Sequence, residues 1–520
     1  AGCVLADRLS ADGNQVLVLE AGGADDDIMV KVPALFAGMF QGPNDWNYNS
    51  DSEPGLLGRR VYLPRGKMLG GCSSMNALIY MRGARQDFDA WVRDFGATGW
   101  SYDEVLPYFT RSENNADIHD RYHGTDGGLH VTTQRWTSPH AQAFIDSAVA
   151  AGIERNDDFN GEHQAGTGMF QVTAHNGKRC SAADAFLRPA LERDNVELLT
   201  SATVHRVLLD GHRAVGVEYE RDGQRHTATA TREVVLSAGA YNTPKLLMLS
   251  GIGPDAHLRE HGIDVVLDSP QVGANLQDHP LTLLHWATDA ADTLADLGDP
   301  SYYEQWMADG TGKLSSNAAE SAVLWKSDPA LDRADFQIIF VPGFFWEHGM
   351  RRPAESGMTI GLSYNGPTSR GSVRLASADP AAAPRIVSNL LSQQSEVDAV
   401  LRAIDLVDDI ASRVPLADVL GERVNPGRGT PDLAAWVRAE TQHMYHASCT
   451  ARIGSPEDGV VDPELRVHGI DGLRVVDASV MPRIASGNTN APTIMIGERG
   501  ADLLLGRPAP ASPLAAPASA

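Results

Sequence analysis

The first 23 residues of the chain, AGCVLADRLSADGNQVLVLEAGG, constrain its fold more than any other stretch. Residues 4–9 carry the apolar stripe of a helix, and residues 11–14 are typical of a turn. The apolar run 16–19 is typical of a buried strand, and it ends at the carboxylate of Glu20. This order of helix, turn, strand and acid predicts the second half of a dinucleotide-binding βαβ unit. Glu20 then either binds the ribose hydroxyls of an adenosine or is a solvated acid at a strand end.

The first half of such a unit, a strand and a Gly-rich loop, is expected upstream of Ala1. Ala1 and Gly2 fit the last two positions of a G-x-G-x-x-G loop, because Gly2 precedes Glu20 by a spacing close to the ~20 residues typical of this motif. That strand is normally central in the parallel sheet, so its loss would leave strand edges unpaired and part of a pyrophosphate site absent. We therefore expect a polypeptide that begins at Ala1 to fold poorly or to bind its dinucleotide weakly.

Length and charge exclude several classes of protein. The chain has 520 residues, too many for one hydrophobic core, so two or more domains are expected. Its formal net charge of −24 repels phosphate backbones and anionic membrane surfaces, so nucleic acid is not an expected partner. No apolar stretch reaches the ~18 residues that a membrane-spanning helix needs.

Cysteine usage indicates a reducing compartment. The four cysteines are far apart in the sequence, and none lies in a C-x-x-C pair. This pattern argues against a disulfide framework and against a zinc site, and we expect a cytoplasmic protein. No H-E-x-x-H or similar pattern stands out, so no metal site is predicted.

Local patterns predict several elements. A helix is expected over about 139–151, and strands are expected within 197–240. Asp222 and Gly223 lie between two alternating segments and predict a hairpin turn. The last helix is expected from about 492 to 505.

A further helix is expected in the stretch NTPKLLMLSGIG, which follows the strand REVVLSAGA. Asn242 or Thr243 would be its N-cap, and Pro244 would lie in its first turn, where a missing amide proton does no harm.

Residues 281–445 differ in character from the rest. They hold most of the tryptophans, and segments such as MTIGLSYN and GSVRLAS alternate between apolar and polar residues as strands do. We expect an α/β protein of two domains, one Rossmann-like and one built on a mostly antiparallel sheet. The expected boundaries are 1–135, 170–280 and 446–506 for the dinucleotide domain, 136–169 and 281–445 for the substrate domain, and a disordered Pro/Ala-rich tail over 507–520.

Two further stretches carry candidate chemistry. Gly70 and Gly71 allow the backbone to approach a flat cofactor closely, although an ordinary loop would look the same. His446 lies in a short polar turn, HMYHASCT, and a neutral imidazole there can take a hydroxyl proton. Asn488 and Asn490 flank Thr489 just before a helix start, where an amide could hold the same oxygen. Because the chain has 17 histidines, composition alone favours a structural role for any one of them.

Together these stretches resemble the glucose–methanol–choline (GMC) flavoprotein oxidoreductases over nearly the whole chain. GAYNTPKLLMLSGIG (239–253) is similar to the second family signature, and GKMLGGCSSMN (66–76) to the first, except that Cys72 takes a place usually given to Gly, Ser or Thr. VGANLQDH, DPELRVHGIDGLRVVDAS and GNTNAPTIMIGERGADLL look like the remaining landmarks. The sequence HASCT is most similar to that of the choline dehydrogenase-like branch.

The resemblance implies FAD as cofactor and assigns roles to individual residues. It makes His446 the active-site base and Asn488 its partner. It places the FAD contacts at Gly2, Glu20, Gly71, Ser74, Asn76, Val204, Asp477, Ala478 and Asn490. Some members attach FAD covalently through a His at the position of Met75; Met cannot form that bond, so non-covalent FAD is expected.

The implied reaction is oxidation of a primary alcohol to an aldehyde, in which His446 takes the hydroxyl proton and a hydride passes to flavin N5. The implied partners are a small alcohol and an electron acceptor, which could be oxygen, a quinone or another carrier. Two alternatives keep the fold: a non-redox member such as a hydroxynitrile lyase or a photodecarboxylase, and an inactive, N-terminally truncated chain.

The substrate stays open at this point. Choline needs an aromatic cage and usually a carboxylate for its trimethylammonium head. Phe344, Phe345, Trp346 and Glu347 could supply both, but packing in the domain core is the favoured interpretation of these residues. Aliphatic or aryl alcohols fit an apolar pocket equally well.

Overall fold

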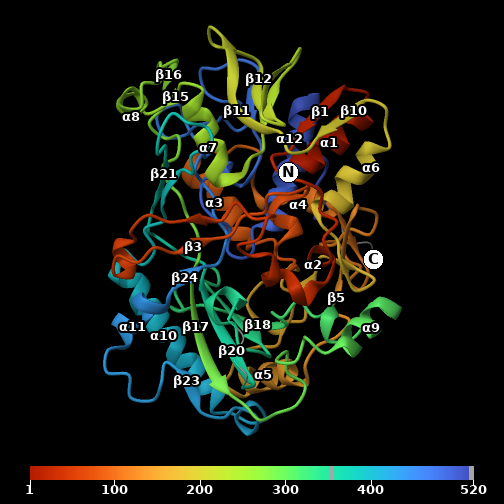
Figure 1. Cartoon of the computed structure of the whole chain (residues 1–520). Coiled ribbons are helices and arrows are strands. Elements are labelled where there is room, and N and C mark those ends of the chain that lie inside the picture. The colour runs from red at the N-terminus through yellow and green to blue at the C-terminus, as the bar shows by residue number, and fades with distance from the viewer. Residues whose placement is uncertain (352, 354, 515–520) are drawn as a thin grey trace.

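The computed structural model describes residues 1–351, 353 and 355–514. Figure 1 shows β1, β10, β11, β12, α1 and α12 in one half of the molecule and β17, β18, β20, α5, α10 and α11 in the other. Two large hydrophobic cores match these halves, because the buried residues of each cluster come largely from one set of elements. The predicted α/β class with a Rossmann-like part and an antiparallel part is confirmed.

Two separate pairs of parallel strands lie in the first half. β1 (Val16–Leu19) pairs with β10 (Val196–Leu199), and β14 (Val234–Leu236) pairs with β25 (Leu473–Val475). The helices α1 (Gly2–Ala11) and α12 (Asn490–Leu505) pack against each other beside them. Gly497 allows this approach, since a Cβ there would lie 2.9 Å from the Cα of Ala1.

One edge of β1 and one edge of β14 face a common cavity. Among the described residues β1 pairs with β10 alone, and its residues line the same cavity as Val234–Leu236. Leu17 is 42% exposed as a result, although its neighbours in sequence are typical of a buried strand. The strand expected upstream of Ala1 stays a prediction.

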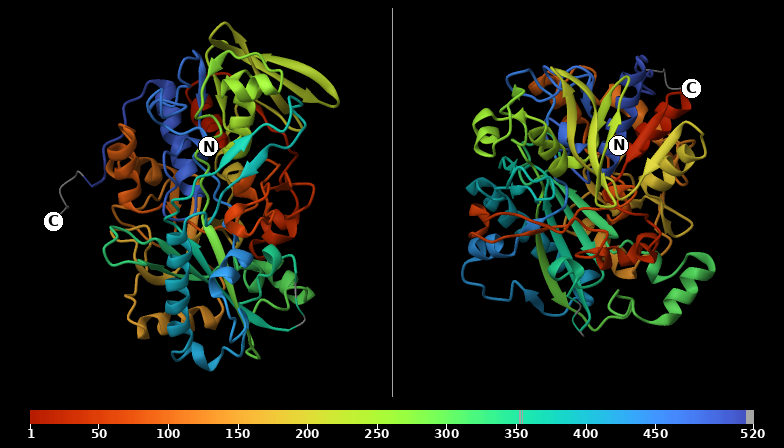
Figure 2. Two further views of the ribbon diagram at one scale, coloured as in Figure 1. Left: turned by 90° about the vertical axis from the view of Figure 1, so that its left-hand side faces the viewer. Right: turned by 45° about the horizontal axis from the view of Figure 1, so that its top comes forward.

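A three-stranded antiparallel sheet, β11 (Thr203–Asp210), β12 (Arg213–Arg221) and β13 (Gln224–Thr229), projects from one end of the molecule (Figure 2). The predicted hairpin at Asp222 and Gly223 is confirmed. Both residues have positive φ, 54° and 71°, as a two-residue turn of the primed type requires. β12 and β13 continue the pairing without a bulge up to this turn.

The helix expected from Asn242 begins earlier, and its predicted N-cap was wrong. α7 spans Gly239–Leu249 because the Asp477 carboxylate accepts the Gly239 amide at 2.9 Å and opens the helix there. Pro244 therefore lies inside α7 and leaves the Ala240 carbonyl without its helical donor. The buried hydroxyl of Thr450 donates to that carbonyl at 2.7 Å, so the proline is tolerated.

A seven-stranded antiparallel sheet organises the second half, with α5 and α10 on one face. Apolar residues alternate along its central strands, so one set packs on these helices and the other set faces the first half of the molecule. The elements are α5 (Pro139–Ala150), α10 (Gln394–Ala411), β6 (Gly166–Met169), β17 (Pro280–Ala287), β18 (Ser321–Trp325), β19 (Phe336–Val341), β20 (Gly357–Tyr364), β23 (Arg423–Asn425) and β24 (Gln442–His443).

Further elements complete the two halves. The remaining helices are α2 (Ile28–Lys31), α3 (Arg85–Phe95), α4 (Tyr102–Ser112), α6 (Arg188–Leu191), α8 (Asp255–Glu260), α9 (Pro300–Asp309) and α11 (Leu433–Glu440). The short strands are β2 (Tyr48–Asn49), β3 (Tyr62–Leu63), β4 (Glu113–Asn115), β5 (Leu129–Thr133), β7 (Gln171–Val172), β8 (Ala174–His175), β9 (Lys178–Arg179), β15 (Ile252–Gly253), β16 (Leu267–Asp268), β21 (Ser372–Arg374) and β22 (Arg385–Val387).

The predicted helix near 139–151 is confirmed by α5, and the last helix by α12, which begins at Asn490 rather than near 492. Residues 507–514 of the predicted tail form neither helix nor strand, and residues 515–520 lie outside the described part. No helix among the described residues is long and apolar enough to cross a membrane.

Candidate active site

A cavity of about 1590 Å³ lies between the two halves. It extends from the carboxyl end of β1, past the Gly-rich loop at residues 70–76, to the imidazole of His446. The first half contributes the ends of β1 and β14 and the N-termini of α1 and α12. The second half contributes the floor, which is one face of the seven-stranded sheet. The cavity therefore brings together segments from both ends of the chain.

Glu20 lies at one end of this cavity. Its carboxylate accepts the Gly22 amide at 2.7 Å, and burial raises the pKa of the carboxyl to about 7. Gly2 and Val204 also line this end, from α1 and β11. A Cβ on Gly2 would come 3.4 Å from the Ser237 Cβ, so the start of α1 lies close to the end of β14.

The Gly-rich loop forms one wall. Gly71 has φ of 55° and open space at its Cβ position, so its backbone is presented to the cavity. Asn76 lines the cavity while its Oδ1 accepts from Arg179 at 2.7 Å. Ser74 does not line it, since this fully buried residue donates its hydroxyl to the Leu69 carbonyl at 2.7 Å. Met75, which replaces a possible attachment residue, lines the cavity.

The opposite wall is made by the turn after β25 and by the start of α12. Ala478 and Asn490 both line the cavity, and the free amides of the first α12 turn carry partial positive charge. The Asp477 side chain is already engaged, because it accepts from the Gly239 amide, the Thr243 hydroxyl and the Ser479 amide. Asp477 thus positions α7 and its own turn.

His446 and Asn488 lie side by side at the far end of the cavity. Asn488 Nδ2 lies 3.2 Å from His446 Nε2, and both residues line the cavity. Asn488 Oδ1 in turn accepts from Gln337 Nε2 at 3.0 Å. An amide nitrogen can only donate, so in this arrangement His446 Nε2 carries the lone pair.

A second histidine supports this protonation state. His279 Nδ1 lies 2.9 Å from His446 Nδ1, and one of the two must donate to the other. Because Nε2 of His446 is the acceptor toward Asn488, its Nδ1 is the donor toward His279. Burial lowers the pKa of His446 to about 4, and burial together with the nearby His446 lowers the pKa of His279 to about 3. Both imidazoles are therefore neutral at pH 7.

The backbone under this pair is held by Asp278. Its Oδ1 accepts the amides of His279 and His446, both at 2.8 Å, and its Oδ2 lies 3.1 Å from His443 Nδ1 and 3.7 Å from Arg65 Nη2. Burial would raise the pKa of this carboxyl, but His443 and Arg65 hold it at about 2. Asp278 is thus a fixed negative charge whose oxygens are all used within the protein.

Sequence reasoning missed four residues of this site: Arg65, Asp278, His279 and Gln337. Asp278 and His279 belong to the stretch VGANLQDH, which resembles a family landmark, but no role was assigned to them. Gln337 carried no signal, because one amide on a buried strand is a common structural residue.

The fold places the four residues of the aromatic stretch 344–347 in different environments. Trp346 stacks on His285 with ring centroids 3.7 Å apart, outside the cavity, and Phe344 packs beside both rings. Glu347 is 65% exposed and lies near Arg351. Phe345 alone of the four lines the cavity, while Phe344 and Trp346 are half-buried beside His285.

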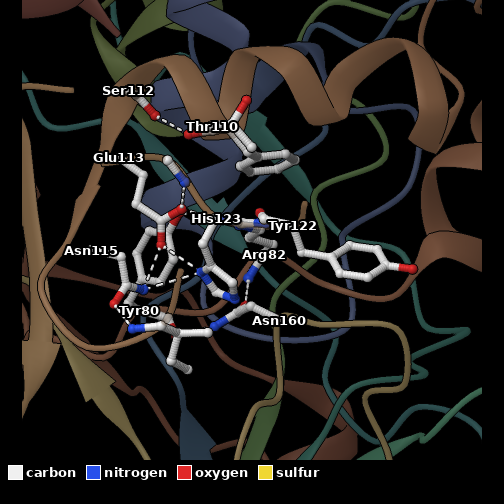
Figure 3. A network of polar contacts seen from close by, with 12 residues as sticks. Tyr80, Arg82, Thr110, Ser112, Glu113, Asn115, Tyr122, His123 and Asn160 are labelled. Carbon is white, nitrogen blue, oxygen red and sulfur yellow. Dashed lines mark hydrogen bonds and ion pairs between the residues drawn. The ribbon is translucent and has the colours of Figure 1, made fainter. Parts of the chain in front are cut away.

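A second buried polar network lies beside the cavity wall rather than in it (Figure 3). The buried Arg82 guanidinium pairs with Glu113, whose Oε1 lies 3.0 Å from His123 Nδ1. His123 Nε2 lies 3.0 Å from Asp158. Opposite charges alternate along this chain of contacts, and burial without such pairing would be costly.

Comparison with known proteins links this cavity to one family. A family model described as GMC oxidoreductase matches residues 17–281, and a second model with the same description matches residues 367–497. An oxygen-dependent choline dehydrogenase of Rhizobium johnstonii is 40% identical over 525 residues, covering 98% of this chain and 94% of that protein. A GMC-type oxidoreductase of Mycobacterium bovis is 42% identical over 517 residues, covering 97% of each.

Solved structures show the same architecture. The pyridoxine 4-oxidase of Mesorbium loti superposes with a TM-score of 0.88 at 29% identity, covering 97% of both chains. A formate oxidase variant of Aspergillus oryzae, solved in connection with FAD modification, superposes with a TM-score of 0.89 at 26% identity, covering 97% of this chain and 96% of that one.

Proposed function

The chain belongs to the GMC oxidoreductase family, and from this premise we propose that it oxidises a primary alcohol to an aldehyde with FAD, using His446 as the base. The observation that carries the proposal is a neutral imidazole whose Nε2 lone pair faces the amide nitrogen of Asn488 at 3.2 Å, at the end of one long cavity. Relatives named as dehydrogenases and oxidases support the redox reaction, and none of those compared supports a lyase or a photodecarboxylase.

The residues along the cavity fit FAD. Glu20 offers a carboxylate for ribose hydroxyls, and the start of α12 offers free amides and partial positive charge for phosphate. Gly71 leaves the space that a side chain would fill. Met75 leaves the cofactor non-covalent.

When bound, FAD supplies the hydride acceptor. The chain itself supplies proton transfer and positioning. His446 Nε2 accepts the hydroxyl proton of the alcohol, and the Asn488 amide donates to the oxygen as negative charge develops on it. Gln337 holds the Asn488 amide, while Asp278 and His279 hold His446. The positive charge that His446 gains is stabilised by the nearby carboxylate of Asp278.

The proposal also includes the electron acceptor and the cellular compartment. Electrons leave the protein to oxygen, a quinone or another carrier. The cytoplasm is the proposed compartment, which the four free cysteines of the chain favour.

The test is anaerobic reduction of the FAD-loaded chain by alcohols, followed by flavin absorbance. We expect bleaching in the wild type and a decrease in the reduction rate of about 100- to 10,000-fold in His446→Gln, with FAD content unchanged. His468→Gln is the matched control, because His468 lies outside the cavity and contacts the Gly454 carbonyl at 3.0 Å. Equal rates in wild type and His446→Gln would refute the role of His446.

A further inference from the structure

We propose that the substrate of this enzyme is an uncharged, apolar primary alcohol and not choline. The inference rests on the proposed function and specifies which kind of substrate binds in the part of the cavity beyond His446. It departs from the choline dehydrogenase relative, because no carboxylate of the described residues lines this end of the cavity to pair with a quaternary ammonium group.

The floor of the substrate end is an apolar sheet face. Leu281 and Leu283 of β17 line it, together with Ile339 and Val341 of β19. Side chains two residues apart on a strand point to the same face, and the antiparallel register places Leu283 opposite Gly361 of β20. A Cβ on Gly361 would meet both leucines at 3.2 Å, so this glycine keeps the floor open.

Aromatic rings form the side wall, and they pack mainly on one another. Phe36 and Phe345 stack with centroids 6.2 Å apart, and Phe40 lies 6.0 Å from Phe36 and 5.9 Å from Tyr445. The Tyr445 hydroxyl is occupied by His348 at 2.7 Å. Phenylalanine rings can attract a cation weakly, but they bury an alkyl or aryl group equally well.

Among the described residues, no carboxylate lines the substrate end. The acidic residues that border the cavity all come from elements of the nucleotide end: Glu20, Asp194, Glu197, Glu220, Glu233, Asp379 and Asp477. Asp278, which accepts the His446 amide, has both oxygens engaged within the protein. Arg65, which does line the cavity, is a cation.

A trimethylammonium head bound here would lose its hydration without gaining a carboxylate on the cavity wall. Burying an unpaired charge is strongly unfavourable, whereas burying a tert-butyl group of the same shape is favourable. Charge alone should therefore separate choline from its neutral isostere. We expect a preference of at least about 100-fold for the neutral alcohol.

The first experiment compares choline with 3,3-dimethylbutan-1-ol, which replaces N⁺ by carbon, and adds hexanol and benzyl alcohol. The FAD-loaded wild type is mixed anaerobically with each alcohol, and the second-order rate of flavin bleaching is measured. The best neutral alcohol should exceed choline by at least about 100-fold. Choline equal to or faster than the best neutral alcohol would overturn the inference. If no alcohol, including choline, bleaches the flavin, the proposed function itself fails.

The second experiment places a carboxylate on the cavity floor. Leu283→Glu should lower the ratio of neutral-alcohol to choline rates at least about tenfold relative to Leu283→Gln, which is the uncharged control of equal size. Flavin absorbance and circular dichroism check that both variants fold and bind FAD. A ratio that is the same in the two variants would show that the head group does not contact this floor. The isostere comparison in the wild type decides the inference if either variant fails to fold.

Discussion

At the scale of single residues, the protonation state of His446 governs the chemistry. Burial lowers the pKa of this imidazole to about 4, while the negative charge of Asp278 acts in the opposite direction. The base is therefore unprotonated and competent well below neutral pH. A histidine with its ordinary pKa near 6.5 would lose activity two pH units earlier.

This predicts the pH profile of flavin reduction. The second-order rate constant should be constant between about pH 6 and 9 and should fall about tenfold per pH unit below about pH 4, as His446 becomes protonated. pH-jump stopped flow keeps the exposure to acid short enough to measure this limb. An apparent pKa near 7 in the free enzyme would contradict the buried, neutral state of the pair with His279.

At the scale of elements, α7 shows how one tertiary hydrogen bond compensates for a proline inside a helix. Pro244 removes the amide that would bond the Ala240 carbonyl, and the Thr450 hydroxyl replaces it from a segment 210 residues away. The same segment carries His446, so the start of α7 and the active-site turn are tied together. A buried carbonyl left without a donor costs about 1–3 kcal/mol.

Thr450→Val should therefore lower the free energy of unfolding by about 1–3 kcal/mol, measured by chemical denaturation. Thr430→Val is the matched control. Its hydroxyl bonds the exposed Gly427 carbonyl, which also accepts the Thr430 amide, so its loss should change stability by less than about 0.5 kcal/mol. Equal effects in the two variants would mean that the Ala240 carbonyl does not depend on Thr450.

At the scale of the whole molecule, the network of Arg82, Glu113 and His123 (Figure 3) continues to Asp158 and ties distant segments together. Arg82 follows the loop that lines the cavity, and Asp158 lies between α5 and β6, which belong to the second half. Burial acts to lower the pKa of His123, but its hydrogen bonds to Asp158 and Glu113 raise it to about 9. His123 is therefore charged at neutral pH.

A raised pKa links this network to stability. The charged His123 contributes about 3 kcal/mol to the free energy of unfolding. This contribution is complete below about pH 6.5 and is lost as the pH rises through about 9. We expect the Tm of the wild type to fall between pH 7 and pH 9.5, and that of His123→Gln to be lower at pH 7 and to fall less over this range. His212→Gln, at an exposed position, is the control and should retain the wild-type slope.

What the sequence by itself determined is local. The Asp222–Gly223 turn, the long helices α5 and α12 and the alternation of β20 follow from φ preferences and from side-chain period, which neighbouring residues set. His446 and Asn488 were identified through family motifs that lie 42 residues apart.

Only the tertiary structure decided which groups complete the site. His279 meets His446 across 167 residues, Gln337 reaches Asn488 from the sheet, and Asp477 sets the start of α7 by accepting the Gly239 amide. Trp346 stacks on His285 outside the cavity, and apolar residues of β17 and β19 line the substrate end. These contacts depend on packing between segments that are far apart in the chain. Each side chain has many possible partners there, and its neighbours in sequence do not determine which partner it contacts.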